Sequence, residues 1–112
     1  MKHIFSELGE IKIHRNLISQ IVEAATLGVE GVSSLSLSSN QWLSKIFSRL
    51  KIKGIKVDMS KDLRIEVPII VKYGYNIPTV ATRVQEEVLK SLSKSLNIET
   101  AYIIVKVKGL SH

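Results

Sequence analysis

The sequence predicts an α+β fold in which a single layer of helices covers one face of a mainly antiparallel four-stranded sheet. Two neighbouring stretches carry this prediction. Between Leu63 and Tyr73, apolar and polar residues alternate, which is typical of a strand with one buried face. From Ile77 to Leu96, apolar residues recur at spacings of three and four, which describes one face of a long helix. With the remaining elements, in the order βα(α)ββαβ, they favour a ferredoxin-like split βαβ topology.

The first predicted elements are a short strand and a helix. Residues Glu10 to His14 alternate in polarity, so we expect a strand with Ile11 and Ile13 pointing inward. Asn16 is a suitable N-cap for the helix that follows, and Gly28 is a suitable C-terminal stop. The expected buried stripe of this helix consists of Leu17, Ile18, Ile21, Val22, Ala24 and Ala25.

The middle of the chain contains a serine-rich stretch and a second amphipathic segment. Val32 to Ser39 is either extended or a mobile loop, since leucines and serines alternate in it. Gln41 to Leu50 is predicted to be a helix, because its apolar residues repeat at helical spacing. Beyond Gly54, residues Ile55 to Met59 alternate as a strand. The short link after them predicts a hairpin with the strand Leu63 to Tyr73.

The turn between the long strand and the long helix is specified by three residues. Gly74 can take a positive φ, Asn76 can cap the helix, and Pro78 suits the first helical turn, where a missing N–H costs little. One residue resists the split βαβ topology. Pro68 lies inside a predicted interior strand and lacks a ladder donor, so either a bulge is present there or the strand lies locally at an edge.

The C-terminal part is predicted to contain one more strand. Asn97 can end the long helix, and residues Ala101 to Val107 alternate as the final strand. The tail from Gly109 to His112 is expected to fray. We interpret residues 1–112 as a single domain with a core over about 9–110 and an inserted basic amphipathic segment over about 40–53.

Composition points to an intracellular protein. The chain has 112 residues, 45% of them hydrophobic, and no cysteine, so it has no disulfide framework and no thiol chemistry. The first residues contain no apolar run of signal-peptide length, and no run approaches the ~20 residues that a membrane span requires. We therefore expect a cytoplasmic protein that is at most peripheral at the inner membrane face.

The formal net charge of +6 is concentrated in one part of the chain. No acidic residue lies between Gly31 and Val57. Apolar residues on one side of the predicted helix in this window and basic residues on the other suit two arrangements. The helix either packs on its own sheet or a neighbouring subunit, or it lies in a membrane interface against anionic lipid. The candidate membrane or partner surface consists of Trp42, Lys45, Ile46, Phe47, Arg49, Lys51 and Lys53.

No pattern typical of an enzyme is present in the sequence. His3, His14 and His112 do not have metal-ligand spacing, and no phosphate-binding loop, dinucleotide fingerprint or nucleophile elbow occurs. We expect no catalytic residues, no metal, no cofactor and no small-molecule substrate. Residues 28–31 match the GxxG loop of KH nucleic-acid-binding domains, but Glu30 would repel phosphate, so a helix stop and a turn are favoured. The basic charge keeps an RNA-binding module as the alternative function.

The block from Val71 to Pro78, VKYGYNIP, resembles the most recognisable block of the alkaline-shock, cell-envelope stress response proteins of Gram-positive bacteria. Other segments are similar to the same family, and the resemblance spans about residues 9–110. These segments are Gly9–Ile11, Ile21, Ala24 and Ala25, Val29–Val32, Gly54–Val57, Val84, Gln85, Val88 and Val105–Leu110.

The resemblance implies a cytoplasmic, non-enzymatic protein that gathers at the inner face of the membrane, associates through a membrane-anchored partner and self-assembles. It brings no catalytic residues. Many members are acidic whereas this chain is basic, and the segment before Gly54 contains a tryptophan and basic residues; both departures suit direct lipid contact. The predicted function is therefore that of an interaction protein of envelope stress or homeostasis. It is expected to act as a homo-oligomer on a membrane-anchored protein or on anionic lipid.

Overall fold

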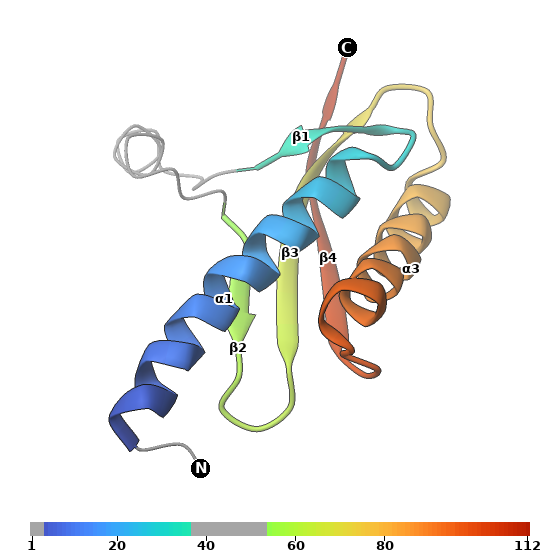
Figure 1. Cartoon of the computed structure of the whole chain (residues 1–112). Coiled ribbons are helices and arrows are strands. Elements are labelled where there is room, and N and C mark those ends of the chain that lie inside the picture. Colours follow the sequence, from blue (N-terminus) through green and yellow to red (C-terminus); the bar gives the residue numbers. More distant parts are fainter. Residues whose placement is uncertain (1–3, 37–53) are drawn as a thin grey trace, which may run out of the picture.

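The computed structural model describes residues 4–36 and 54–112, which form two helices and four strands (Figure 1). Both helices lie on one face of the sheet (Figure 1), so the α+β prediction is confirmed. The elements in chain order are α1 (Ile4–Leu27), β1 (Val32–Leu35), β2 (Lys56–Asp58), β3 (Arg64–Lys72), α3 (Ile77–Leu96) and β4 (Tyr102–Ser111).

The strand β3 is the centre of the sheet, because each of the other strands pairs with it. β1 and β2 share one of its edges, where both run antiparallel to it and form ladders with its C-terminal and N-terminal halves, respectively. β4 runs parallel to β3 along the whole of the other edge. The predicted hairpin between β2 and β3 is therefore confirmed, and two of the three strand pairings are antiparallel.

Pro68 is accommodated because its missing N–H falls between β1 and β2. The carbonyl of Pro68 accepts a hydrogen bond from the backbone N–H of Ser36 at 2.9 Å. The N–H and C=O positions of one strand residue point to the same edge, so the absent donor faces the gap between the two short strands. The chain returns here at Gly54, whose φ is +81° and where an added Cβ would lie 3.3 Å from the Pro68 ring. Of the two alternatives for Pro68, the local edge is confirmed.

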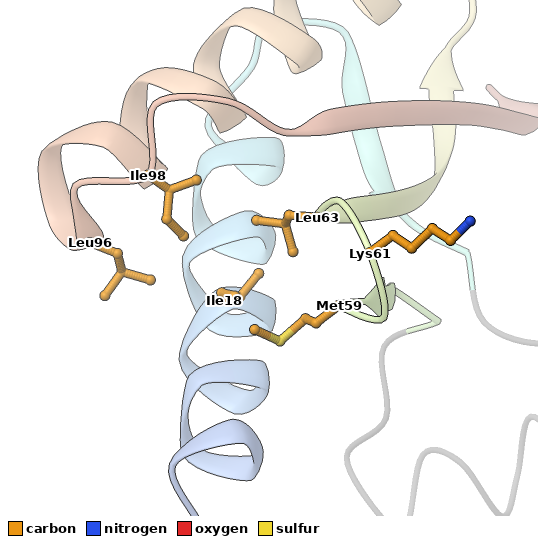
Figure 2. A pocket seen from close by; sticks show the side chains of 6 residues that line it. All are labelled: Ile18, Met59, Lys61, Leu63, Leu96 and Ile98. Carbon is orange, nitrogen blue, oxygen red and sulfur yellow. The ribbon is translucent and has the colours of Figure 1, made fainter. Parts of the chain in front are cut away.

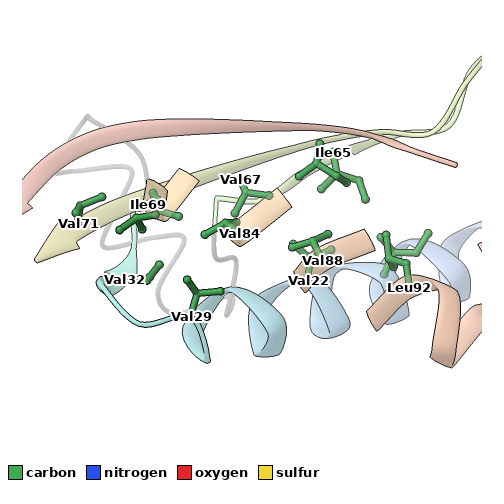
Figure 3. Packing of buried hydrophobic residues seen from close by; sticks show 13 residues of the cluster. Val22, Val29, Val32, Ile65, Val67, Ile69, Val71, Val84, Val88 and Leu92 are labelled. Carbon is green, nitrogen blue, oxygen red and sulfur yellow. The ribbon is translucent and has the colours of Figure 1, made fainter. Parts of the chain in front are cut away.

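The core lies between the sheet and the two helices. Alternate residues of β3 point toward the helices and are fully buried, as the period-2 pattern predicts. Figure 3 shows these side chains meeting those of the helices, and fully burying each one contributes about 1.5–3 kcal/mol. The fully buried apolar residues are Ile65, Val67, Ile69 and Val71 from β3, Val84, Val88 and Leu92 from α3, and Val22 from α1, with Ile18 and Val80 close behind.

The turn and the two ends of α3 follow their sequence signals. Gly74 has a φ of +96°, and the Asn76 side chain accepts hydrogen bonds from the backbone N–H and the hydroxyl of Thr79 at 3.0 and 2.9 Å. Pro78 stands in the first helical turn, where its missing donor is not needed. Asn97 ends the helix with a φ of 57°, in the left-handed region. All four predictions are confirmed.

The predicted strand at Glu10 to His14 is wrong, because these residues belong to α1. Asn16 is likewise no cap but an exposed position inside that helix. Five residues are too few to separate period 2 from a helical repeat, and Ile4, Leu8 and Ile11 also fit the helical spacing. The chain therefore enters the fold through a helix rather than through the first strand of a split βαβ unit.

The remaining elements differ from expectation in smaller ways. The tail is not frayed, since β4 continues to Ser111, whose carbonyl accepts a hydrogen bond from the Tyr73 N–H at 2.7 Å. Val32 to Leu35 is extended, as one of the two alternatives had it. In the predicted stripe of α1, Leu17 is 39% exposed. The predicted helix Gln41 to Leu50 lies outside the described residues.

Candidate functional site

The amphipathic segment that the sequence singled out remains a prediction, because residues 37–53 lie outside the described part of the chain. This applies to Trp42, Lys45, Ile46, Phe47, Arg49, Lys51 and Lys53. The other predicted residues, Gly74, Asn76 and Pro78, are described and form the turn between β3 and α3. Their side chains and backbone shape that turn.

A second candidate surface is the face of the sheet that points away from α1 and α3, which we call the open face. The residues between the buried positions of β3 point to it, and the strand register brings their neighbours alongside. Within residues 4–36 and 54–112, neither helix crosses this face (Figures 1 and 3). Its charged and larger apolar residues are Lys56, Asp58, Arg64, Glu66, Ile70, Lys72, Tyr102, Ile104 and Lys106.

An ion pair lies in the middle of the open face. The Nζ of Lys106 on β4 is 2.9 Å from the Oε1 of Glu66 on β3. This hydrogen bond, more than any other interaction, holds the pKa of Glu66 below its ordinary value, and the positive charges of Lys106, Lys56 and Lys108 lower the pKa further. Glu66 therefore stays ionised among three lysines, which limits their mutual repulsion.

Toward the β2–β3 hairpin, the open face carries a cation over an aromatic ring. The guanidinium of Arg64 lies 5.1 Å from the centroid of the Tyr102 ring, within the range of a cation–π interaction. The nearby Asp58 carboxylate accepts hydrogen bonds from the backbone N–H and the hydroxyl of Ser60, at 3.0 and 2.8 Å. These bonds lower the pKa of Asp58, with a smaller contribution from Arg64. The carboxylate of Asp58 thus serves the hairpin turn.

Charge is distributed unevenly between the two sides of the molecule. On the open face four basic residues, Lys56, Arg64, Lys72 and Lys106, stand against Asp58 and Glu66. On the helical side, Arg15, Arg83, Lys90 and Lys94 are balanced by Glu23, Glu30, Glu86 and Glu87. The excess positive charge of the described strands and helices therefore lies on the open face.

Exposed apolar side chains accompany this charge. Tyr102 is 55% exposed and Ile104 is 37% exposed, and both belong to the part of β4 that faces away from the helices. At the far end of the sheet, Tyr73 is 68% exposed and its ring lies 5.5 Å from that of His112. The sequence pattern predicts Tyr73 on the buried face, which is wrong because β3 ends at Lys72 and the chain turns away there.

The described residues also line an apolar cavity of about 350 Å³ at the hairpin end of the core (Figure 2). Its walls come from α1, the β2–β3 hairpin and the chain after α3: Ile18, Met59, Lys61, Leu63, Leu96 and Ile98. The amino group of Lys61 points away from the other five side chains (Figure 2). In this part of the chain, no three His, Cys, Asp or Glu residues are grouped so that they could hold a metal ion. The cavity thus offers apolar surface without converging reactive groups.

No helix among the described residues has the length and apolar character needed to cross a membrane.

Comparison with known proteins identifies a family and a curated relative. The sequence model of the alkaline shock protein 23 family, described by its cell envelope-related function, matches residues 3–112. The uncharacterized protein YqhY of Bacillus subtilis (strain 168) is 29% identical over 112 residues, which cover 98% of this chain and 83% of that protein. No solved structure matches the chain. Since the family model spans nearly the whole sequence, the protein belongs to the alkaline shock protein 23 family, which has a cell envelope-related function.

Proposed function

We propose that this protein is a non-enzymatic interaction protein of the cell envelope, which self-associates and lies at the cytoplasmic face of the membrane. The open face is the docking surface in this proposal, and its occupant is an anionic membrane surface. The observation that carries the proposal is the excess of basic residues on a sheet face that neither described helix covers. The family's envelope-related function supports the same proposal.

The open face has the physical properties that such docking needs. Lysine and arginine side chains near an anionic leaflet each contribute about 1 kcal/mol, and this attraction extends only about a Debye length, ~8–10 Å. A sheet face brings Lys56, Lys72 and Lys106 to one surface, whereas the helical side is balanced in charge. Tyr102 adds an amphipathic ring of the kind that prefers the headgroup region.

Co-sedimentation with anionic and with zwitterionic vesicles tests this proposal. The test variant is Lys56→Glu combined with Lys72→Glu, both on the open face. Its matched control is Lys90→Glu combined with Lys94→Glu on α3, which changes the net charge by the same amount on the other side. We expect the wild type and the control to bind anionic vesicles. We expect the test variant to bind about thirtyfold more weakly, because at least two favourable charge interactions are lost.

Two results would contradict the proposal. If both double variants lose affinity equally, net charge alone decides the binding and the open face has no special role. If the wild type ignores anionic vesicles at low salt, no lipid docking occurs. Circular dichroism of both variants confirms that each remains folded.

One observation favours the alternative of single-stranded RNA binding. The Arg64–Tyr102 pair offers a ring and a guanidinium on an open sheet face, on which a base could stack. Base stacking on an aromatic ring is worth about 1–3 kcal/mol, so Tyr102→Ala should weaken RNA binding at least fivefold if RNA is the ligand. Saturable submicromolar RNA binding at moderate salt, without vesicle binding, would replace the first proposal by this one.

A further inference from the structure

β4 is the long uncovered edge of the sheet. The opposite edge of β3 is divided between β1 and β2, which have four and three residues, and such short strands are poor templates for pairing. β4 has ten residues and, among the described strands, pairs only with β3. A continuous edge of this length is a ready template for another strand.

The backbone groups available on this edge can be assigned residue by residue. The Tyr102 N–H donates to the Leu63 carbonyl at 2.9 Å, so the backbone of Tyr102 faces β3. Because successive strand residues point to opposite edges, the backbone groups of Ile103, Val105 and Val107 face outward. The register shift between β3 and β4 follows immediately after Val107. The outward ladder therefore consists of these three residues.

The usual protection of an edge strand is weak here. Lysines on an edge normally discourage pairing, but Lys106 is bonded to Glu66 of its own sheet at 2.9 Å. Among the described residues, the side chain that occupies an outward backbone group is Gln85 of α3, whose amide donates to the Ile103 carbonyl at 2.9 Å. A carbonyl oxygen accepts two hydrogen bonds, so Gln85 need not leave when a strand arrives.

We propose that a second copy of this chain pairs its β4 antiparallel with this β4, about a two-fold axis at Val105. This register uses all three outward residues, with Val105 opposite itself and Ile103 opposite Val107 of the second copy. On the open face it places Ile104 opposite Lys106 of the second copy and Tyr102 opposite Lys108. Each lysine then meets an aliphatic or aromatic side chain rather than another lysine, and such cross-strand pairs are favourable or neutral.

Neighbouring registers are worse. With the axis at Lys106, the two Lys106 side chains would lie directly opposite each other, and like charges in that position are unfavourable. With the axis at Ile104, Val107 would find no partner within the strand, since its counterpart is Ala101, before the start of β4. The axis at Val105 is thus the arrangement in which charge and backbone pairing agree.

This inference rests on the self-association in the proposed function and names its surface. Pairing at β4 would join two sheets into one and place both open faces on the same side. The paired molecule would present a basic surface of twice the area to a membrane. Because the pairing is measured without vesicles, its failure can be told apart from a failure of membrane docking.

Disulfide trapping tests the interface, because the chain has no cysteine and an introduced thiol reports only on its own surroundings. Residues opposite each other in a hydrogen-bonded pair have Cα atoms about 5.5 Å apart, within disulfide range. We expect Val105→Cys to form a covalent dimer under mild oxidation at micromolar concentration. The matched control is Val57→Cys, which replaces another half-buried valine in the edge strand β2 and should react at least tenfold more slowly.

A charge exchange tests the register. Ile104→Lys places a lysine opposite Lys106 of the second copy and should weaken the dimer about tenfold in sedimentation velocity. Adding Lys106→Glu should restore the dimer, because the lysine introduced at position 104 would then face a glutamate of the second copy. That introduced lysine also lies beside Glu66 in its own sheet, which keeps the charges of each copy balanced.

Two results would refute the β4 interface. One is that Val105→Cys cross-links no faster than Val57→Cys, and the other is that the charge exchange does not restore the dimer. Self-association that persists unchanged in the Ile104→Lys variant would leave the proposed function standing and would also refute this interface.

Discussion

Replacing Gly31 with alanine should destabilise the fold more than the same change at Gly74. Gly31 lies between α1 and β1 with a φ of +100°, and its carbonyl accepts the Lys72 N–H at 2.8 Å. A Cβ at Gly31 would lie 2.7 Å from Cγ2 of Val80 and 2.9 Å from Cδ1 of Tyr75. Gly74 has a similar φ of +96°, but a Cβ there would meet nothing within 4 Å. The two positions therefore share the backbone strain and differ in the clash.

The magnitudes follow from these two terms. A left-handed backbone costs a non-glycine residue about 1–2 kcal/mol, which is the whole effect expected for Gly74→Ala. Overpacking adds about 1–3 kcal/mol, so Gly31→Ala should lower the free energy of unfolding by about 2–5 kcal/mol in total. Since a domain of this size is stable by about 5–15 kcal/mol, the loss is a large fraction of its stability.

Urea denaturation followed by far-UV circular dichroism measures both variants. The midpoint should fall for each, and the melting temperature should fall by about 4 °C per kcal/mol. If Gly31→Ala loses no more stability than Gly74→Ala, the space above Gly31 can accommodate a methyl group. The packing of Val80 and Tyr75 around the α1–β1 turn would then be looser than the distances indicate.

Two further changes test polar groups. Lys106 lowers the pKa of Glu66, so the pair adds stability above the unfolded carboxyl pKa of about 4.5, and this contribution is lost as the pH falls through the lower folded pKa. Glu66→Gln should therefore flatten the fall of the melting temperature between about pH 5 and pH 3. The Thr26 hydroxyl is fully buried and has no hydrogen-bond partner among the described residues, so Thr26→Val should raise the free energy of unfolding by about 1 kcal/mol in urea denaturation.

Each of these predictions has a defined contrary result. An unchanged acid profile in Glu66→Gln would mean that the Lys106 contact does not persist in solution. A loss of stability in Thr26→Val would mean that the hydroxyl finds a partner. Thr79→Val is the control for the second change, because the Thr79 hydroxyl donates to Asn76 and its removal should not stabilise the protein.

Long elements with a clear period could be predicted from the sequence, and short ones could not. The alternation along β3 and the helical spacing of α3 extend over nine and twenty residues, so chance agreement is excluded. Asn76 and Asn97 mark the ends of α3 through local hydrogen bonding, which depends on no distant part of the chain. The strand prediction from Glu10 to His14 is wrong because five residues fit both periods.

The open face could not be derived in the same way, because it depends on strand register. Lys56, Glu66 and Lys106 are far apart in the chain and meet only because β2 and β4 both pair with β3. Period 2 identifies the outward positions of each strand separately, and collecting their charges would have given the basic composition of the face. The parallel pairing of β3 with β4 and its shift after Ile69 have no signal in the local sequence.

The central position of β3 affects how the protein is made. One entire side of this strand is bonded to β4, which is translated only after all of α3. Contacts so distant in sequence form late, and until they form, a row of amides and the large aliphatic side chains of β3 lack their final cover. A nascent chain still attached to the ribosome before Tyr102 therefore exposes one edge of its most aggregation-prone strand, which makes it a natural client for a chaperone at the exit tunnel.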